Sequence, residues 1–246
     1  EYDRAKAAFE EALVIAREVG NKAQASLALL GLASVAQAQG DPQTARALFE
    51  EAQPPGPEVG DRWMANFRMR QADLLLDLGD TAAARSRCEE GLALRRAGEY
   101  PALIAQALLE VGHAAWLHGD AGAARAYALE ALRLCQEQEN KGGILAALES
   151  LAAAAGSQGV SSPHPEGTRR GRAGNERAAR LAGAAEAQRE ALGLPGATGW
   201  RRPRERMRAA LGAVSLEQEC AAAWAEGRAL SLEQAISAAL VEIAVS

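Results

Sequence analysis

Apolar residues recur along the chain at intervals of three and four, which is the spacing of one face of an α-helix. Two successive stripes are Leu29, Leu32, Val35 and Ala36, then Ala45, Leu48, Phe49 and Ala52. Gly40-Asp41 lies between them. Glycine readily takes the left-handed conformation that ends a helix, and Asp is a preferred cap for the next one. Pro42 follows at a first-turn position, where its missing N–H costs nothing. The pattern predicts two antiparallel helices joined by a Gly-Asp turn.

The same turn recurs at intervals of 39 and 40 residues. Its copies are Gly40-Asp41, Gly79-Asp80 and Gly119-Asp120. Five residues after each Asp there is an Arg preceded by Ala, and ten residues after it there is a Glu followed by a small residue. The chain opens in this register with Ala5-Lys6 and Glu11-Ala12, and we interpret Gly174-Asn175 with Ala179-Arg180 as a fifth, shifted copy. Such a period indicates stacked helix pairs that share a continuous core.

Composition supports helices and excludes a sheet as the main element. Alanine accounts for 59 of the 246 residues, whereas Val, Ile and Thr together number 18 and aromatic residues make up 4%. Alanine is the strongest helix former, and strands are enriched in β-branched and aromatic residues. Small residues also stand where paired helices should cross, at Ala33 and Ala45, Ala72 and Ala84, and Gly112 and Ala124. We predict an all-α right-handed solenoid of antiparallel helix pairs with C-terminal capping helices.

This pattern resembles the tetratricopeptide repeat, in which a small residue in the first helix precedes the turn and an Ala, an aromatic residue and an Ala-Leu pair follow it. The matching positions are Ala5, Phe9, Ala12 and Leu13; Ala33, Gly40, Ala45, Phe49 and Ala52; Ala72, Gly79, Ala84 and Gly91; and Gly112, Gly119, Ala124, Ala131 and Leu132. The period is longer than the roughly 34 residues of the family, and Cys88 and Ala128 stand where an aromatic is usual. A 40-residue period also suits HEAT or armadillo arrays. The Gly-Asp turn with its fixed Ala favours the tetratricopeptide type.

Two later segments, 178–186 and 223–231, resemble the C-terminal sensor arm of large bacterial ATP-binding signalling regulators, often of the LuxR type. This resemblance implies an attached nucleotide-binding domain, whose motifs are not found in these 246 residues. The repeat register also places Glu1 inside the second helix of a unit, so we expect this chain to be a fragment of a longer protein.

Three regions are expected. Residues 1–155 form the helical repeats, of which the first is incomplete. Residues 156–174, rich in Pro, Gly and Arg, form a mobile insertion, because they offer too little apolar surface to offset the entropy of ordering. Residues 175–246 form a degenerate last repeat and a helical cap. The helices expected there are 175–192, 203–212, 215–227 and a last one capped by Ser231 with Glu233 in its first turn.

The sequence holds no motif for catalysis, cofactor or metal. Its three Lys do not follow a glycine-rich loop that could cradle phosphates. His113 and His118 would lie about 140° apart around a helix, and no Cys pair has zinc spacing. We therefore expect a non-enzyme without cofactor or metal. Three widely spaced Cys and the lack of an apolar run of roughly 20 residues favour a cytoplasmic protein without a membrane segment.

Arginine is concentrated late in the chain, where residues 156–208 carry eleven Arg against five Glu. Residues 169–208 could therefore contact the phosphates of a nucleic acid. Only Trp200 lies near enough in sequence to add base stacking. A solvated linker and a charged helix face are the favoured interpretation, and nucleic acid is disfavoured as a partner.

In the tetratricopeptide family the first helices line a concave groove, and the resemblance implies that four positions of each unit point into it. The implied partner-binding residues are Leu30, Ser34, Asn66, Met69, Asp73, Gln106, Leu109, His113 and Trp116, with Leu27, Gln37 and Leu76 beside them. This mixture of apolar and polar groups suits a protein or peptide ligand. Alternatively, Leu30, Met69 and Leu109 only pack between neighbouring units. The set lacks the Lys and Asn with which related repeats clamp a terminal carboxylate, which argues against chaperone-tail binding.

Together these observations predict a non-catalytic binding protein. The favoured function is the effector-sensing or partner-binding arm of a bacterial transcriptional or signalling regulator. A free-standing assembly scaffold is the first alternative, and nucleic-acid contact through residues 169–208 is the second. Salt dependence separates the second alternative from the others, because affinity that depends on phosphate contacts falls steeply with salt.

Overall fold

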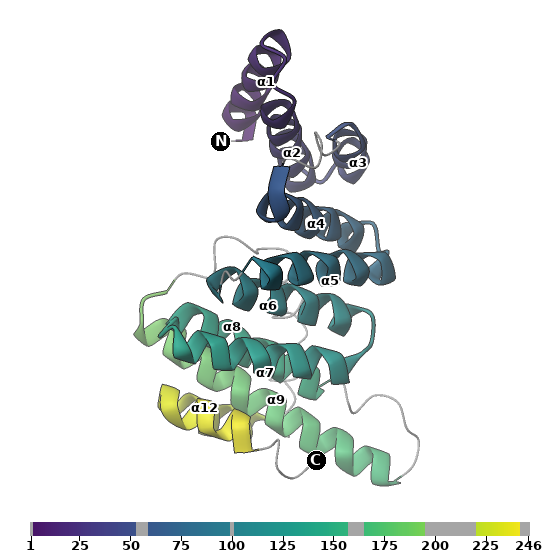
Figure 1. Ribbon diagram of the computed structural model, residues 1–246. Coiled ribbons are helices and arrows are strands. Elements are labelled where there is room, and N and C mark those ends of the chain that lie inside the picture. Colours follow the sequence, from purple (N-terminus) through teal and green to yellow (C-terminus); the bar gives the residue numbers. More distant parts are fainter. Residues whose placement is uncertain (1, 53–58, 99–100, 157–164, 195–219, 242–246) are drawn as a thin grey trace. The chain divides into compact units, whose positions relative to one another are not determined.

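Helices account for all the regular secondary structure in the part of the chain that the computed structural model describes (Figure 1). The structure describes residues 2–52, 59–98, 101–156, 165–194 and 220–241. The chain divides into two compact units, residues 1–100 and residues 101–246, each with a hydrophobic core of its own. The prediction of an all-α protein is confirmed.

Unit 1 is built from helices that pack in chain order. They are α1 (Tyr2–Glu18), α2 (Lys22–Ala38), α3 (Pro42–Glu51), α4 (Gly60–Asp77) and α5 (Thr81–Ala97). Extensive contacts join α1 to α2, α2 to α3 and α4 to α5, whereas α3 touches α4 along a much smaller area. Phe49 of α3 and Phe67 of α4 meet edge to face with ring centroids 6.1 Å apart, and Trp63 stacks on Phe67 at 5.3 Å. These rings connect the core of α2 and α3 to α4.

Unit 2 continues the pairing and ends in a helical cap. Its described helices are α6 (Pro101–Leu117), α7 (Ala121–Glu137), α8 (Lys141–Gly156), α9 (Pro165–Ala191), α11 (Ala221–Arg228) and α12 (Leu232–Val241). Helices α6 to α9 pack in sequence, and α11 and α12 lie against α9. Leucines such as Leu132, Leu145 and Leu148 are fully buried between them. The predicted helix pairs and C-terminal capping helices are therefore present.

The Gly-Asp turns have the geometry that the repeat predicts. The turn glycines Gly40, Gly79 and Gly119 have φ angles of 84°, 82° and 89°. In the second turn, Gly79 N–H donates to the Leu76 carbonyl at 3.2 Å, and Asp80 N–H donates to the Leu75 carbonyl at 2.9 Å. This bond pair is the Schellman motif, which satisfies the last carbonyls of the first helix. The Asp80 carboxylate then accepts a hydrogen bond from Ala83 N–H at 3.0 Å and so caps the second helix.

Replacing Asp80 by Ala should lower the free energy of unfolding by about 1 kcal/mol, because the first turn of α5 loses its side-chain acceptor. Urea unfolding followed by circular dichroism measures the change. Asp80→Asn keeps a side-chain oxygen at the cap and is the matched control, expected to lose only a few tenths of a kcal/mol. An equal loss in both variants would contradict the capping role.

Small residues let the paired helices approach closely, as predicted. Ala33 and Ala45 are 0% exposed, and so are Ala72 and Ala84. In the next pair, a Cβ built on Gly112 of α6 would lie 3.4 Å from a backbone carbonyl oxygen of α7. The abundant alanine thus has a structural use, because short side chains fill these contacts at close backbone separation.

The predicted fifth turn at Gly174-Asn175 is wrong. Both residues lie inside α9, which begins at Pro165 and not near residue 175. A Cβ on Gly174 would lie 2.7 Å from the Ala155 carbonyl oxygen of α8, so this glycine serves close helix packing and not a turn. Proline is tolerated at the first helical position, and the Ala, Glu and Arg that follow favour a helix despite the glycines. Residues 165–174 of the expected insertion are therefore helical, and residues 157–164 lie outside the described part.

The last helix begins as predicted. Ser231 Oγ accepts a hydrogen bond from Gln234 N–H at 3.2 Å, and Gln234 Oε1 accepts one from Ser231 N–H at 2.9 Å. This reciprocal pair is a capping box, and Glu233 lies in the first turn of α12. Helix α11 begins at Ala221, and both the predicted helix at 203–212 and the predicted start at residue 215 fall outside the described residues.

Candidate functional site

The first helices of two neighbouring repeats, α2 and α4, are joined by polar side chains in unit 1. Arg70 Nη1 of α4 donates a hydrogen bond to Ser34 Oγ of α2 at 2.8 Å. Gln37 Nε2 of α2 donates another to Asp77 Oδ2 of α4 at 2.9 Å. We call these four residues, together with Asp73, the polar patch of unit 1. The structure thus brings Ser34 and Asp73, both predicted site residues, into one patch.

Arg70 and Asp77 were not among the predicted site residues. Arg70 lies three residues before Asp73 and Asp77 lies four residues after it, so the three share one helix face. That spacing could have predicted that Arg70 and Asp77 lie beside Asp73. The family pattern gives only the positions within one repeat, and it does not say which side chains will bond across neighbouring repeats.

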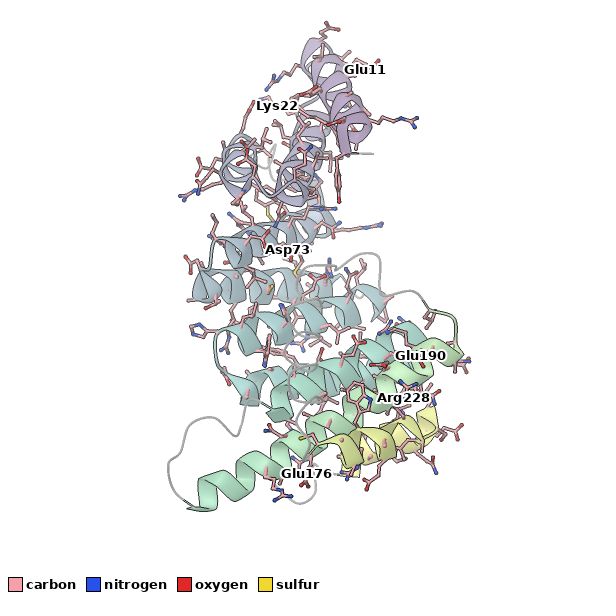
Figure 2. All side chains as sticks on the ribbon, turned by 180° about the vertical axis from the view of Figure 1, so that it is seen from behind. Glu11, Lys22, Asp73, Glu176, Glu190 and Arg228 are labelled. Atoms are coloured by element: carbon pink, nitrogen blue, oxygen red, sulfur yellow. The ribbon has the colours of Figure 1, made fainter. Side chains whose placement is uncertain are left out.

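Asp73 is the electrostatically unusual member of the patch; Figure 2 labels it on α4. Its side chain is half-buried, and its carboxylate receives no hydrogen bond from the described residues. Desolvation raises the pKa of this carboxyl from 3.8 to about 7; Arg70 lowers it, and Asp77 raises it further. Asp73 therefore exchanges its proton near neutral pH.

Asp73→Asn should stabilise the chain at pH 8 but not at pH 4. The folded pKa lies above the unfolded one, so between about pH 4 and pH 7 the unfolded chain releases this proton while the folded chain keeps it. The native protein therefore loses stability relative to Asp73→Asn over that window, and the difference is constant above it. Urea unfolding of both proteins at pH 4, 5.5, 7 and 8 measures this. A difference in unfolding free energy that does not grow with pH would refute the assignment.

Exposure separates the predicted residues of unit 1 into two groups. Leu30 and Met69 are 6% and 5% exposed and belong to the interior of the unit. Leu27 is 43% exposed. Asn66 is also exposed, and its Oδ1 accepts a hydrogen bond from Arg95 Nη2 at 3.2 Å. A partner can thus reach Leu27, Asn66 and the polar patch without rearrangement, whereas Leu30 and Met69 serve packing.

In unit 2 the predicted residues all lie on α6. Gln106 is exposed, and its Nε2 donates a hydrogen bond to Glu110 Oε1 at 2.9 Å. Leu109 and Trp116 are half-buried and pack against the core. His113 is 2% exposed, and its ring lies 5.8 Å from the Trp116 ring. Gln106 is therefore the predicted residue of this unit that is most open to a partner.

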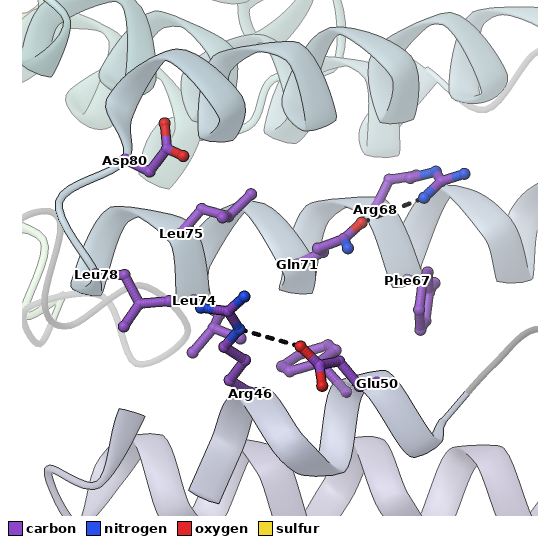
Figure 3. A pocket seen from close by; sticks show the side chains of 10 residues that line it. Arg46, Glu50, Phe67, Arg68, Gln71, Leu74, Leu75, Leu78 and Asp80 are labelled. Atoms are coloured by element: carbon purple, nitrogen blue, oxygen red, sulfur yellow. Dashed lines mark hydrogen bonds and ion pairs between the residues drawn. The ribbon is translucent and has the colours of Figure 1, made fainter. Parts of the chain in front are cut away.

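A pocket of about 570 Å³ lies between α3 and α4, where their contact is small (Figure 3). Its apolar lining is Phe49, Phe67, Leu74, Leu75 and Leu78, and its polar lining is Arg46, Glu50, Arg68, Gln71 and Asp80. Arg46 Nε pairs with Glu50 Oε1 at 3.1 Å, and Arg68 Nη1 donates to Gln71 Oε1 at 3.2 Å. This pocket was not predicted from the sequence. Arg46 and Glu50 already pair with each other, Asp80 caps α5, and the lining holds no nucleophile or histidine.

The side chains that could support chemistry are few. The residues that the structure describes contain no group of three His, Cys, Asp or Glu that could hold a metal. Cys88, Cys135 and Cys220 are buried and form no disulfide with one another, and burial raises the pKa of the Cys135 thiol, which disfavours the reactive thiolate. Within the described ranges, every helix is too short or too polar to cross a bilayer.

Much of the arginine-rich region 169–208 lies outside the described residues. Three of its described arginines form ion pairs. These are Arg172 with Glu176 at 3.1 Å, Arg180 with Glu226 at 2.8 Å, and Arg189 with Glu149 at 2.6 Å. Guanidinium groups engaged with carboxylates are less available to phosphates, so these pairs favour the interpretation of a charged helix face.

Comparisons with known proteins point to one kind of repeat. Residues 1–54 match the tetratricopeptide repeat model. The chain is also similar to a crystal structure of BtubC (BKLC) from P. vanneervenii, with a TM-score of 0.59 and 16% sequence identity, over 100% of this chain and 92% of that chain. At this identity the likeness shows the fold alone. No curated protein matches the chain.

The matched residues contain α1, α2 and α3. The Gly-Asp turn between α2 and α3 recurs between α4 and α5 and between α6 and α7, with the same hydrogen bonds and the same caps. The sequence match and the repeated geometry therefore agree: the described helices form an array of antiparallel pairs of one kind, whose first part matches the tetratricopeptide repeat, followed by the capping helices α11 and α12.

Proposed function

We propose that this array is a non-catalytic scaffold that binds a protein or peptide on the surface of its first helices. The main observation behind the proposal is the environment of the Asp73 carboxylate. A half-buried carboxylate that accepts no hydrogen bond from the described residues costs stability, and proteins tend to keep such groups where they meet a ligand. The tetratricopeptide match supports a protein partner.

The chemistry of the surface limits the partner. Leu27 of α2 offers an exposed apolar contact, and Asp73 and Asp77 offer carboxylate oxygens on the neighbouring first helix α4. A helix or extended peptide with an apolar anchor and a Lys or Arg side chain is complementary to this arrangement. The amide of Gln106 offers a similar polar contact in unit 2.

Asp73→Lys should abolish retention of the partner, because it places a cation opposite the basic group that we expect there. A paired pull-down from source-cell lysate compares this variant with the native chain, after circular dichroism has shown that both fold. Ser86→Lys, an exposed position on the second helix α5, introduces the same charge and is the matched control. A protein that both variants retain as well as the native chain does would contradict binding at the polar patch.

We further propose that the array is the sensor or partner-binding arm of a larger bacterial regulator with a nucleotide-binding domain. The support is the resemblance of segments 178–186 and 223–231 to such arms. Sequencing the gene upstream of the codon for Glu1 tests this. A phosphate-binding loop encoded there supports the regulator, whereas further repeats alone would favour a free-standing assembly scaffold.

The three cysteines are buried and form no disulfide with one another, which fits a reducing compartment. On this basis we propose a cytoplasmic location. Fractionation of source cells, with antibody detection of the protein, checks it. Recovery of the protein mainly in a membrane or secreted fraction would contradict the proposed location.

A further inference from the structure

Helix α4 carries two polar residues where the other first helices carry apolar ones. These are Arg68, whose side chain is 27% exposed, and Gln71, which is half-buried. Their equivalents in α2, α6 and α8, at repeat spacings of 39 and 40 residues, are all apolar and buried: Leu29, Leu108 and Leu148 for Arg68, and Leu32, Val111 and Leu151 for Gln71. Arg68 and Gln71 therefore depart from the repeat at positions that otherwise build the core.

This departure coincides with the pocket between α3 and α4. In two equivalent places, α1 against α2 and α7 against α8, a second helix packs extensively on the next first helix, whereas α3 touches α4 along a small area. The pocket of about 570 Å³ lies at that small contact, and Arg68 and Gln71 both line it (Figure 3). The array thus has polar side chains at the one of these three contacts that is open.

The pocket and the polar patch of unit 1 lie on different faces of α4. Arg68, Gln71 and Leu75 line the pocket, and each lies two positions before a patch residue of the same helix. Because two residues turn an α-helix by about 200°, the two sets of side chains leave α4 in nearly opposite directions. The pocket is therefore a second site, and the inference drawn from it does not depend on the proposed function.

The acidic groups of the lining are already compensated. Glu50 pairs with Arg46 at 3.1 Å. Asp80 caps α5 by accepting a hydrogen bond from Ala83 N–H at 3.0 Å, at the helix end where the positive pole of the helix dipole favours an anion. Neither carboxylate therefore needs a cation from a ligand.

The charge of Arg68 is compensated only in part. Its Nε lies 2.9 Å from Glu90 Oε2, but Arg87 Nη1 lies 2.8 Å from the other oxygen of the same carboxylate. Two guanidinium groups thus share one carboxylate beside the pocket, which leaves an excess of one positive charge. A guanidinium has five N–H donors, and the bonds of Arg68 to Glu90 and Gln71 use two of them. Arg68 can therefore bind a further anion.

The rest of the lining is apolar. Its members are Phe49, Phe67, Leu74, Leu75 and Leu78. Leu75 is half-buried, and its equivalents in α2 and α6 are the buried residues Ala36 and Ala115, so α4 presents more apolar surface at this position than those helices do. Covering such surface with an apolar ligand is favourable in proportion to the area that leaves water.

We propose that this pocket binds a small organic acid with one carboxylate on an apolar body. The carboxylate accepts charge-assisted hydrogen bonds from the Arg68 guanidinium and a further one from the Gln71 amide. The apolar body lies against Phe67, Leu75 and Leu78. The volume of about 570 Å³ falls in the range of small-molecule sites, roughly 300–1,000 Å³.

Isothermal titration calorimetry of the full chain with 4-phenylbutyrate tests the proposed class of ligand. The uncharged amide of the same acid, 4-phenylbutyramide, has nearly the same shape and is the matched probe. We expect the acid to bind at least about tenfold more tightly than the amide, since hydrogen bonds to a charged group are the stronger ones. Equal affinities, or no binding of the acid at millimolar concentration, would overturn the proposal.

The double variant Arg68→Leu with Gln71→Val tests the location. It gives α4 the residues of α6 at these positions, so we expect it to fold, and its affinity for the acid should fall at least about tenfold. Arg87→Leu is the matched control, because it removes the same charge from the same Glu90 but does not line the pocket. Its affinity should change by less than about threefold, since solvent screens a charge outside the pocket.

A second variant keeps the test decisive if the double variant fails to fold. Arg68→Gln removes the charge, retains a polar side chain and carries the same expected loss of affinity. Unchanged affinity in a folded Arg68 variant would overturn the proposal, and so would equal losses in that variant and in Arg87→Leu. Binding of the acid that is lost with Arg68 and kept without Arg87 supports it.

Discussion

Gly227→Ala should lower the free energy of unfolding by about 3 kcal/mol, at the upper end of what overpacking costs. A Cβ on Gly227 of α11 would lie 2.0 Å from the Arg180 carbonyl oxygen of α9, where no atom fits. Gly183 of α9 makes the reciprocal approach, since a Cβ there would lie 2.5 Å from the Trp224 carbonyl oxygen. Because both obstacles are backbone atoms, α11 must move away from α9 and lose the packing of Ala223.

Ion pairs across the same two helices cannot offset this loss. Figure 2 shows Arg228 of α11 beside Glu190 of α9, and the guanidinium lies 2.7 Å from Glu190 and 2.8 Å from Glu186. All three side chains are more than a third exposed, so solvent screens their attraction. We expect the glycine crossing, and not these pairs, to hold α11 in place.

Urea unfolding followed by circular dichroism measures the effect of Gly227→Ala. Gly122→Ala is the matched control, because a Cβ on Gly122 in the first turn of α7 would meet only Asp120 Oδ1, at 3.6 Å. That variant should be neutral or slightly stabilising, since Ala is the better helix former. If the two variants unfold at the same urea concentration, the close crossing of α9 and α11 is refuted.

Arg189→Met should lower the free energy of unfolding by about 4 kcal/mol, the loss expected when one partner of a buried ion pair is removed. Arg189 Nη2 of α9 lies 2.6 Å from Glu149 Oε1 of α8, and the two side chains are 11% and 9% exposed. The substitution keeps the length of the side chain but removes the Arg189 guanidinium from the Glu149 carboxylate in the interior. The cost arises from this desolvated charge, because α8 and α9 still have apolar residues to pack.

The double variant Glu149→Leu with Arg189→Met separates charge from packing. With neither charge present, apolar side chains of similar size should restore most of the stability, as replaced buried ion pairs often do. Urea unfolding of the two single variants and the double variant completes a double-mutant cycle. If the double variant loses the sum of the two single losses, the pair does not act through buried charge.

Much of the fold could be predicted because its signals are local. The turn at Gly79-Asp80 needs a residue in the left-handed conformation and a capping side chain, and these two adjacent residues supply both. The crossing of Ala72 and Ala84 follows from the repeat period, since equivalent small residues recur at equivalent positions. Ser231 and Gln234 likewise form a capping box over four residues.

Predictions from the sequence were wrong or incomplete where one type of residue can serve two structural roles. Glycine ends helices, but it also permits close packing inside them, and Gly174 against Ala155 is the second kind. Composition alone does not separate these uses. The contacts of Arg70 with Ser34 and of Arg189 with Glu149 also join residues 36 and 40 positions apart, and the repeat period alone does not pair their side chains.

The candidate site was predicted less completely than the fold. The family positions located Asp73 but did not decide whether Leu30 and Met69 would bind a partner or pack between units, and they did not indicate that Arg70 and Asp77 would complete the patch. Exposure depends on how neighbouring helices pack, which a pattern within one repeat does not contain. The pocket between α3 and α4 likewise results from a small contact area between two helices and has no sequence motif.

The central claim, that a partner binds the first helices, is tested most directly by site-specific photo-crosslinking. Benzoylphenylalanine is placed at exposed positions of first helices, Asn66 of α4 and Gln106 of α6, and at exposed positions of second helices, Ser86 of α5 and Ala126 of α7. Irradiation in source-cell lysate should join one partner protein to positions 66 and 106 and not to positions 86 and 126. Crosslinks of that protein at positions 86 and 126 alone would contradict the account.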